Sequence, residues 1–174
     1  MWGQPPSAVR RANASAKRKK MSEIEVTLAS ALVGRYQANL ARIRELATPL
    51  NESEFWTKPY PYGNSFGHLV LHLTGNLNYY IGAQIANTGY VRDREREFTD
   101  AKPPSKQETL TQLDAAVALV AETIRRQSSA DWAKQYSAIG TSCANRLDIV
   151  MHCAVHMQHH IGQMIYIGYE LKQR

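Results

Sequence analysis

Apolar residues recur at steps of three and four along four long stretches of this 174-residue sequence. This spacing places them on one face of an α-helix, and no stretch shows the sustained alternation that a β-strand needs. We therefore expect helices over about residues 22–48, 64–87 and 105–124, and from within 141–145 to about 171. Four amphipathic helices bury their apolar faces most simply in a bundle, so we predict an all-α, four-helix-bundle fold. The long connections leave the order of up and down helices open.

Local signals at the helix ends support these boundaries. Asn64 or Ser65 can cap the second helix through its side-chain oxygen. Ser105 is a candidate cap for the third helix, with Glu108 at the capping-box position. Between these two helices lies a charged linker, residues 92–104.

The excess charge of the chain is concentrated in one segment. Residues 1–20 hold six basic side chains and no acidic one, which accounts for the whole formal charge of +6. The remaining residues hold fifteen basic and fifteen acidic side chains. We therefore predict a disordered basic extension over residues 1–20 and one helical domain over residues 21–174. The neutral body does not support a nucleic-acid partner, except through the extension.

The sequence predicts neither a membrane span nor a secretory signal. No apolar run approaches the roughly 18 residues that a membrane-spanning helix needs, so no membrane partner is expected. Glu23 and Glu25 interrupt the stretch that follows the basic residues, which argues against a signal peptide. Two cysteines, Cys143 and Cys153, are too few for a disulfide framework and indicate reduced thiols in a cytoplasmic protein.

Histidine spacing is the strongest functional signal in the chain. All six histidines lie on the second and fourth expected helices: His68 and His72 on one, and His152, His156, His159 and His160 on the other. A spacing of four residues places side chains one turn apart on the same face. Imidazoles on facing helices can hold zinc, nickel, copper or iron. The competing interpretation is a set of packed or surface histidines that bind nothing.

Helix geometry narrows the choice of ligands. His156 and His160 can reach one point together, whereas His152 lies about 12 Å from His160 along the helix axis. His159 is rotated by about 100° from His160 around the helix axis, so its side chain should point away from the face that His156 and His160 share. Either histidine of the second helix can supply the third nitrogen. Three histidines without a fourth protein ligand leave an open coordination position, which is typical of catalytic or substrate-binding sites.

Two motifs resemble one branch of the DinB/YfiT-like superfamily. The first begins with Asn64-Ser65 and continues to His72-Leu73-Thr74-Gly75-Asn76, and the second is His156-Met157-Gln158-His159-His160-Ile161-Gly162-Gln163. The charged linker is also similar to that branch, and the resemblance covers about residues 21–174. It implies a four-helix bundle, usually a homodimer, that holds a divalent metal such as zinc or nickel. It also implies His72, His156 and His160 as the ligands, with His68 and Gln163 beside the metal or in its pocket.

The resemblance further implies a class of chemistry. Characterised relatives use low-molecular-weight thiols such as bacillithiol and mycothiol, and one is a thiol-dependent maleylpyruvate isomerase. We therefore expect a thiol transferase that attacks an electrophilic small molecule in a stress or detoxification role. Tyr79, Tyr80 and Tyr166 can line the substrate pocket, although core or rim positions are commoner for tyrosines.

Two alternatives stay open. A metal-dependent hydrolase would need a general base. Asp148 is the nearest acidic candidate, and its place four residues before His152 puts it too far along the helix for this role. The other alternative is a stress-induced metal-binding protein without turnover.

Overall fold

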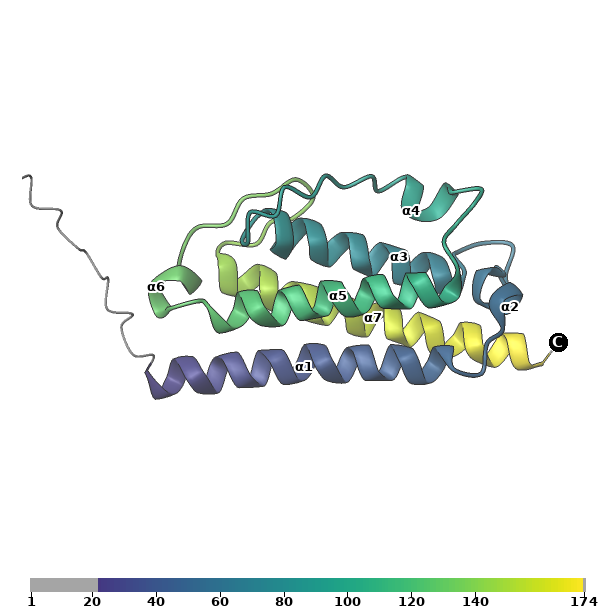
Figure 1. Ribbon diagram of the computed structural model, residues 1–174, viewed down its shortest axis with the longest axis horizontal. Helices are drawn as coiled ribbons and strands as arrows, with labels where there is room; N and C mark the ends of the chain where they lie inside the picture. Colours follow the sequence, from purple (N-terminus) through teal and green to yellow (C-terminus); the bar gives the residue numbers. More distant parts are fainter. Residues whose placement is uncertain (1–21, 174) are drawn as a thin grey trace, which may run out of the picture.

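The computed structural model describes residues 22–173, and four long helices form its body (Figure 1). These are α1 (Glu23–Ala47), α3 (Phe66–Leu77), α5 (Lys106–Arg125) and α7 (Arg146–Lys172). Shorter elements are α2 (Glu52–Trp56), α4 (Arg96–Thr99), α6 (Ser129–Trp132) and the π-helical turn η1 (Asn78–Ala83). Within residues 22–173 the only β-type pairing is an isolated bridge, so the predicted all-α fold is confirmed.

The helix boundaries agree with the capping signals. Ser65 caps α3, and its side chain accepts a hydrogen bond from the backbone N–H of His68. Ser105 caps α5 with the predicted capping box, in which the Glu108 side chain accepts from the Ser105 backbone over 2.9 Å. The extension predicted over residues 1–20 lies outside the described residues.

The second predicted helix departs from regular α-helix near its end. After Leu77 it widens into η1, in which hydrogen bonds reach back five residues, as from Gln84 N to Tyr79 O over 3.3 Å. The chain then leaves the helix at Asn87, which has a positive φ of 54°. A single wide turn adds one residue locally and leaves the overall apolar spacing nearly unchanged, so periodicity does not reveal it.

The long helices follow an up, down, down, up order (Figure 1). α1 packs on α5 and α7, and α3 packs on the same two helices. Adjacent α1 and α7 run parallel, held in part by Tyr36 Oη, which donates to Val150 O over 2.7 Å. Adjacent α3 and α5 also run parallel, so the chain between them must travel the length of the bundle (Figure 1). This crossover, residues 84–105, carries α4 onto the outer side of α3.

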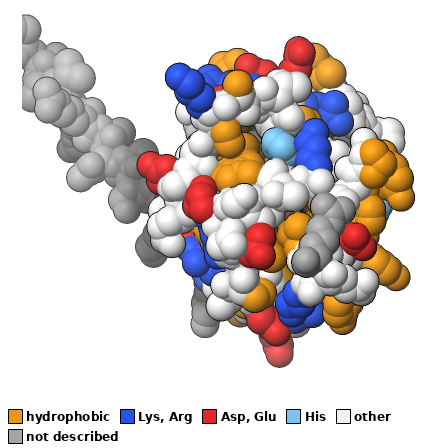
Figure 2. Space-filling view, turned by 90° about the vertical axis from the view of Figure 1, so that its right-hand side faces the viewer, with side chains coloured by type: hydrophobic (Ala, Val, Ile, Leu, Met, Phe, Trp, Pro, Cys, Tyr) orange, Lys and Arg blue, Asp and Glu red, His pale blue; other side chains and the backbone are white. Residues whose placement is uncertain are grey.

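The core between the helices is apolar, whereas the surface is mixed. The largest fully buried side chains of the core include Tyr36, Phe55, Phe66, Met157 and Met164. Figure 2 shows acidic, basic and hydrophobic side chains interspersed at one end of the bundle, where a histidine also reaches the surface. None of the helices in the described part of the chain is long and apolar enough to cross a membrane.

Candidate metal centre

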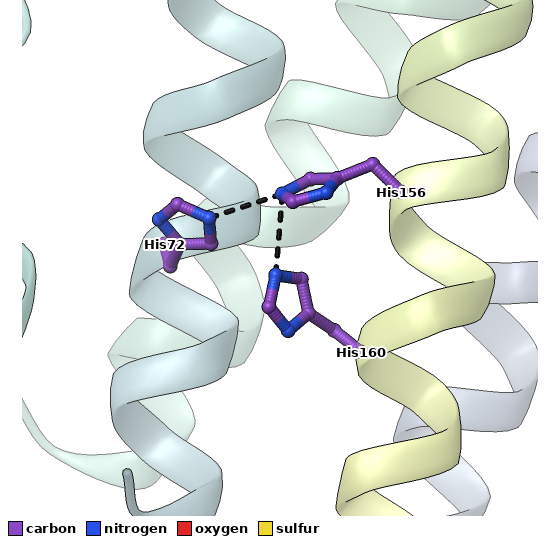
Figure 3. A group of neighbouring side chains, drawn as sticks. All are labelled: His72, His156 and His160. Carbon is purple, nitrogen blue, oxygen red and sulfur yellow. Dashed lines mark hydrogen bonds between the residues drawn. The ribbon is translucent and has the colours of Figure 1, made fainter. Parts of the chain in front are cut away.

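Three histidine side chains from α3 and α7 meet at one point (Figure 3). The Nε2 atom of His156 lies 3.0 Å from Nε2 of His72 and 3.2 Å from Nε2 of His160. The two histidines of α7 lie one turn apart on the same face, as their spacing requires. Because α3 and α7 are antiparallel neighbours, His72 on α3 faces this pair. The structure thus brings together the three residues that the resemblance implies as ligands.

The outer nitrogens of two of these rings are held by hydrogen bonds. Nδ1 of His72 lies 2.9 Å from Oε2 of Glu97, and Nδ1 of His160 lies 2.7 Å from Oε1 of Gln163. A carboxylate and an amide oxygen accept, so these contacts favour a ring hydrogen on Nδ1 in both histidines. Arg92 Nη2, a donor, also lies 3.2 Å from Nδ1 of His72, which is farther than the Glu97 oxygen. The Nε2 atoms of both rings therefore present lone pairs to the shared point.

Burial favours the neutral form of the two α7 histidines in this group. Burial and, to a smaller extent, the neighbouring His160 and His72 together lower the pKa of His156 to about 3. Burial also lowers the pKa of His160 to about 4, although the hydrogen bond to Gln163 opposes part of this shift. At physiological pH both imidazoles are unprotonated, which is the form that binds a metal.

The arrangement fits a divalent cation. Facing lone pairs repel one another unless a cation or a proton lies between them. Nitrogen separations of 3.0 and 3.2 Å are close to those of ligands that each lie about 2.0–2.1 Å from one ion. Hydrogen-bonded Nδ1 groups are the usual orientation of histidine ligands. Within residues 22–173 the convergent group consists of these three histidines, so it leaves coordination positions open.

A buried acidic side chain, Glu97, lies beside the histidines, so the prediction that Asp148 is the nearest acidic candidate is wrong. Glu97 of α4 is 7% exposed and accepts from His72, while Arg92 donates to both of its carboxylate oxygens over 2.7 and 2.9 Å. The prediction failed because residues 92–104 were interpreted only as a linker, whereas the crossover folds them back onto α3. Asp148, the acidic residue considered instead, is exposed and accepts from Ala144 N at the start of α7.

The remaining histidines lie outside the convergent group. His152 and His159 are exposed on α7, and His159 Nε2 lies 3.2 Å from the Gln163 amide nitrogen. His68 lies one turn before His72, where its Nδ1 is 2.8 Å from Ser65 Oγ and its ring meets the edge of Trp56. A pocket role for His68 stays a prediction.

A family model of the DinB superfamily matches residues 35–164. The chain belongs to the DinB superfamily. A crystal structure of a conserved protein from Enterococcus faecalis has the same fold, with a TM-score of 0.58 and 17% identity over 90% of this chain and 99% of that one. No curated protein matches the chain.

One glycine of this DinB chain has a clear steric role. A Cβ atom added at Gly75 would lie 2.0 Å from Oε1 of Glu97. No other residue type therefore fits beside the Glu97 carboxylate in its present position. The glycine of the His-Leu-x-Gly-Asn motif, three residues after His72, was thus a sequence signal that a side chain from elsewhere packs against α3.

Proposed function

We propose that this DinB-superfamily protein holds zinc or nickel through His72, His156 and His160 and transfers a low-molecular-weight thiol to an electrophilic small molecule. The convergence of three imidazole Nε2 atoms at one point carries the proposal. The open coordination positions give a small molecule access to the cation. Stress protection or detoxification is the role we propose for such a reaction.

The chemistry needs an activated sulfur. A divalent cation, when bound, favours a thiolate over a thiol, whose ordinary pKa is about 8.5. The sulfur lone pair forms the new bond to the electrophilic carbon, the thiol proton passes to solvent, and the leaving group departs with its bonding electrons. Glu97 and Gln163 orient two of the three ligand rings through their Nδ1 hydrogens.

Hydrolysis is the weaker alternative because it needs a free general base. Glu97 is the acidic side chain that contacts the histidines, and its oxygens are occupied by Arg92 and by His72. A carboxylate paired with a guanidinium is a poor proton acceptor. A metal-binding protein without turnover is the other alternative, and it needs the same three histidines.

Calorimetry in buffers of different ionisation enthalpy tests the proposal. Metal-loaded protein should bind bacillithiol, mycothiol, glutathione or coenzyme A with release of a proton, and metal-free protein should bind the same thiol poorly. Conjugation of the thiol to a model electrophile should fall by orders of magnitude in His160→Ala. Absence of binding to all four thiols at millimolar concentration would overturn thiol transfer and leave metal binding without turnover, or hydrolysis, as the function.

We also propose that the protein is a homodimer, as the family resemblance implies. The outward face of α7 supports this because it carries exposed apolar side chains, among them Met151 at 52% and Val155 at 67% exposure. Light scattering on purified protein tests it, and a monomer at micromolar concentration would contradict it.

A further inference from the structure

A small cavity adjoins the metal centre at its α7 side. It has a volume of about 260 Å³ and lies between the loop before α3 and the C-terminal half of α7. Three tyrosines form much of its wall: Tyr60, Tyr62 and Tyr166. The rings of Tyr60 and Tyr62 are nearly parallel, with an interplanar angle of 9° and centroids 5.6 Å apart. We name this cavity the tyrosine pocket.

The tyrosine pocket is joined to the metal centre by one side chain. Gln163 lines the pocket, and its Oε1 accepts from Nδ1 of His160. The Gln163 amide nitrogen is in turn held near His159. A molecule in the pocket therefore lies one residue away from a ligand of the candidate metal centre, and any displacement of Gln163 acts on His160.

The lining of the pocket indicates what it binds. Its side chains are aromatic, aliphatic or amide, and none of its lining residues carries a charge. Other cavities of the described bundle do carry charges, such as Arg35 in the groove between α1 and α7 or Asp93 and Arg96 beside α4. Flat aromatic walls favour flat aromatic ligands, and an uncharged wall penalises the burial of an ion.

Exposure of the tyrosines points to the same conclusion. Tyr62 is 75% exposed and Tyr166 is 71% exposed, so neither ring contributes much to the core. Both rings border a concave site beside reactive groups, where aromatic side chains supply contact area at low entropic cost.

We infer that the tyrosine pocket binds the uncharged, planar aromatic part of the substrate, and this inference rests on the proposed function. It assigns the electrophile to the class of neutral aromatic compounds. Gln163 and Asn64 can hydrogen-bond a polar substituent on such a ring, because both amides line the pocket.

Titration of the full chain with 1-naphthol, a fluorescent neutral aromatic probe, tests the inference. Tyr166→Ala should raise the Kd for 1-naphthol about tenfold, which corresponds to about 1.4 kcal/mol. Tyr169→Ala is the matched control because Tyr169 is also exposed on α7 but lines a different cavity, and it should leave the Kd within about twofold. Thermal melts of both variants report whether they are folded.

A second measurement varies the charge of the probe, and a third records its effect on the bound metal. 1-Naphthoate, which has the same ring system with a negative charge, should bind at least about tenfold more weakly than 1-naphthol. In cobalt-loaded protein, 1-naphthol should shift the visible absorption bands of the metal, and Gln163→Ala should abolish the shift.

The outcomes separate this inference from the proposed function. Three results would overturn the inferred ligand of the tyrosine pocket. They are equal binding of 1-naphthol to wild type and Tyr166→Ala, binding of 1-naphthoate as tight as that of 1-naphthol, and no binding of 1-naphthol at millimolar concentration. If 1-naphthol binds as expected while no thiol is conjugated, the pocket stands and thiol transfer fails.

Discussion

Glu97 and His72 are 25 residues apart in the chain, yet the carboxylate accepts the Nδ1 hydrogen of the imidazole over 2.9 Å. Both side chains are less than one-tenth exposed. The contact fixes which nitrogen of His72 carries the hydrogen and which faces the other two histidines.

Removal of a ligand should empty the metal centre. We expect His72→Ala, His156→Ala and His160→Ala each to lose stoichiometric metal, because two histidines leave an ion with too few protein ligands. Metal content by mass spectrometry of purified protein checks this. His159→Ala is the control and should retain the metal, since His159 is exposed outside the convergent group. Loss of metal in His159→Ala with retention in His160→Ala would contradict the ligand assignment.

Glu97→Gln should weaken metal binding without removing a ligand. The substitution removes the negative charge beside His72 Nδ1, so His72 Nε2 donates less electron density to the metal. Loss of such a partner typically costs about 10–100-fold in metal affinity. Competition with a chromophoric chelator measures the zinc affinity. Glu95→Gln changes an exposed acidic side chain of the same crossover and should leave the affinity unchanged. Equal affinities in the two variants would show that Glu97 serves packing alone.

Two glycine substitutions should have opposite effects. Gly75→Ala places a methyl group against the Glu97 carboxylate and should lower both the melting temperature and the metal affinity. Gly162→Ala places a methyl group in open space on α7 and should stabilise the helix by up to about 1 kcal/mol. Thermal denaturation of both variants checks the pair. Destabilisation by Gly162→Ala would instead show that another surface packs against α7 there.

The link between α1 and α6 should depend on pH. Glu25 accepts from the backbone N–H and hydroxyl of Ser129 over 2.5 and 2.6 Å, and these and other hydrogen bonds lower its pKa from 4.5 to about 2. Because the unfolded chain takes up the proton first, this stabilisation is complete above pH 4.5 and is lost as the pH falls towards 2.

Melting temperatures of Glu25→Gln and wild type should therefore differ most at pH 7 and converge in acid. Glu23→Gln, a change in the same helical turn, is the control. A difference that stays constant down to pH 3 would contradict the role of the Glu25 charge.

Sequence periodicity and histidine spacing predicted the four long helices and the face on which His156 and His160 lie. The choice between His68 and His72 was not fixed by spacing, because both lie on the second helix one turn apart. In the structure His72, and not His68, faces His156, because of the axial position at which α3 packs against α7. The positions of Glu97 and Arg92 beside His72 were not predicted, because they depend on the path of the crossover. That path is set by the parallel order of α3 and α5, which loop length did not determine.

The crossover separates the tuning of the three histidines from the stability of the bundle. The three convergent histidines belong to helices that form the core, so mutations near them risk unfolding the protein. Glu97 belongs to a segment at the outer side of α3, where substitutions and insertions disturb the core less. Substitutions in residues 84–105 can therefore change how tightly the three histidines hold a metal while the core of the bundle stays intact.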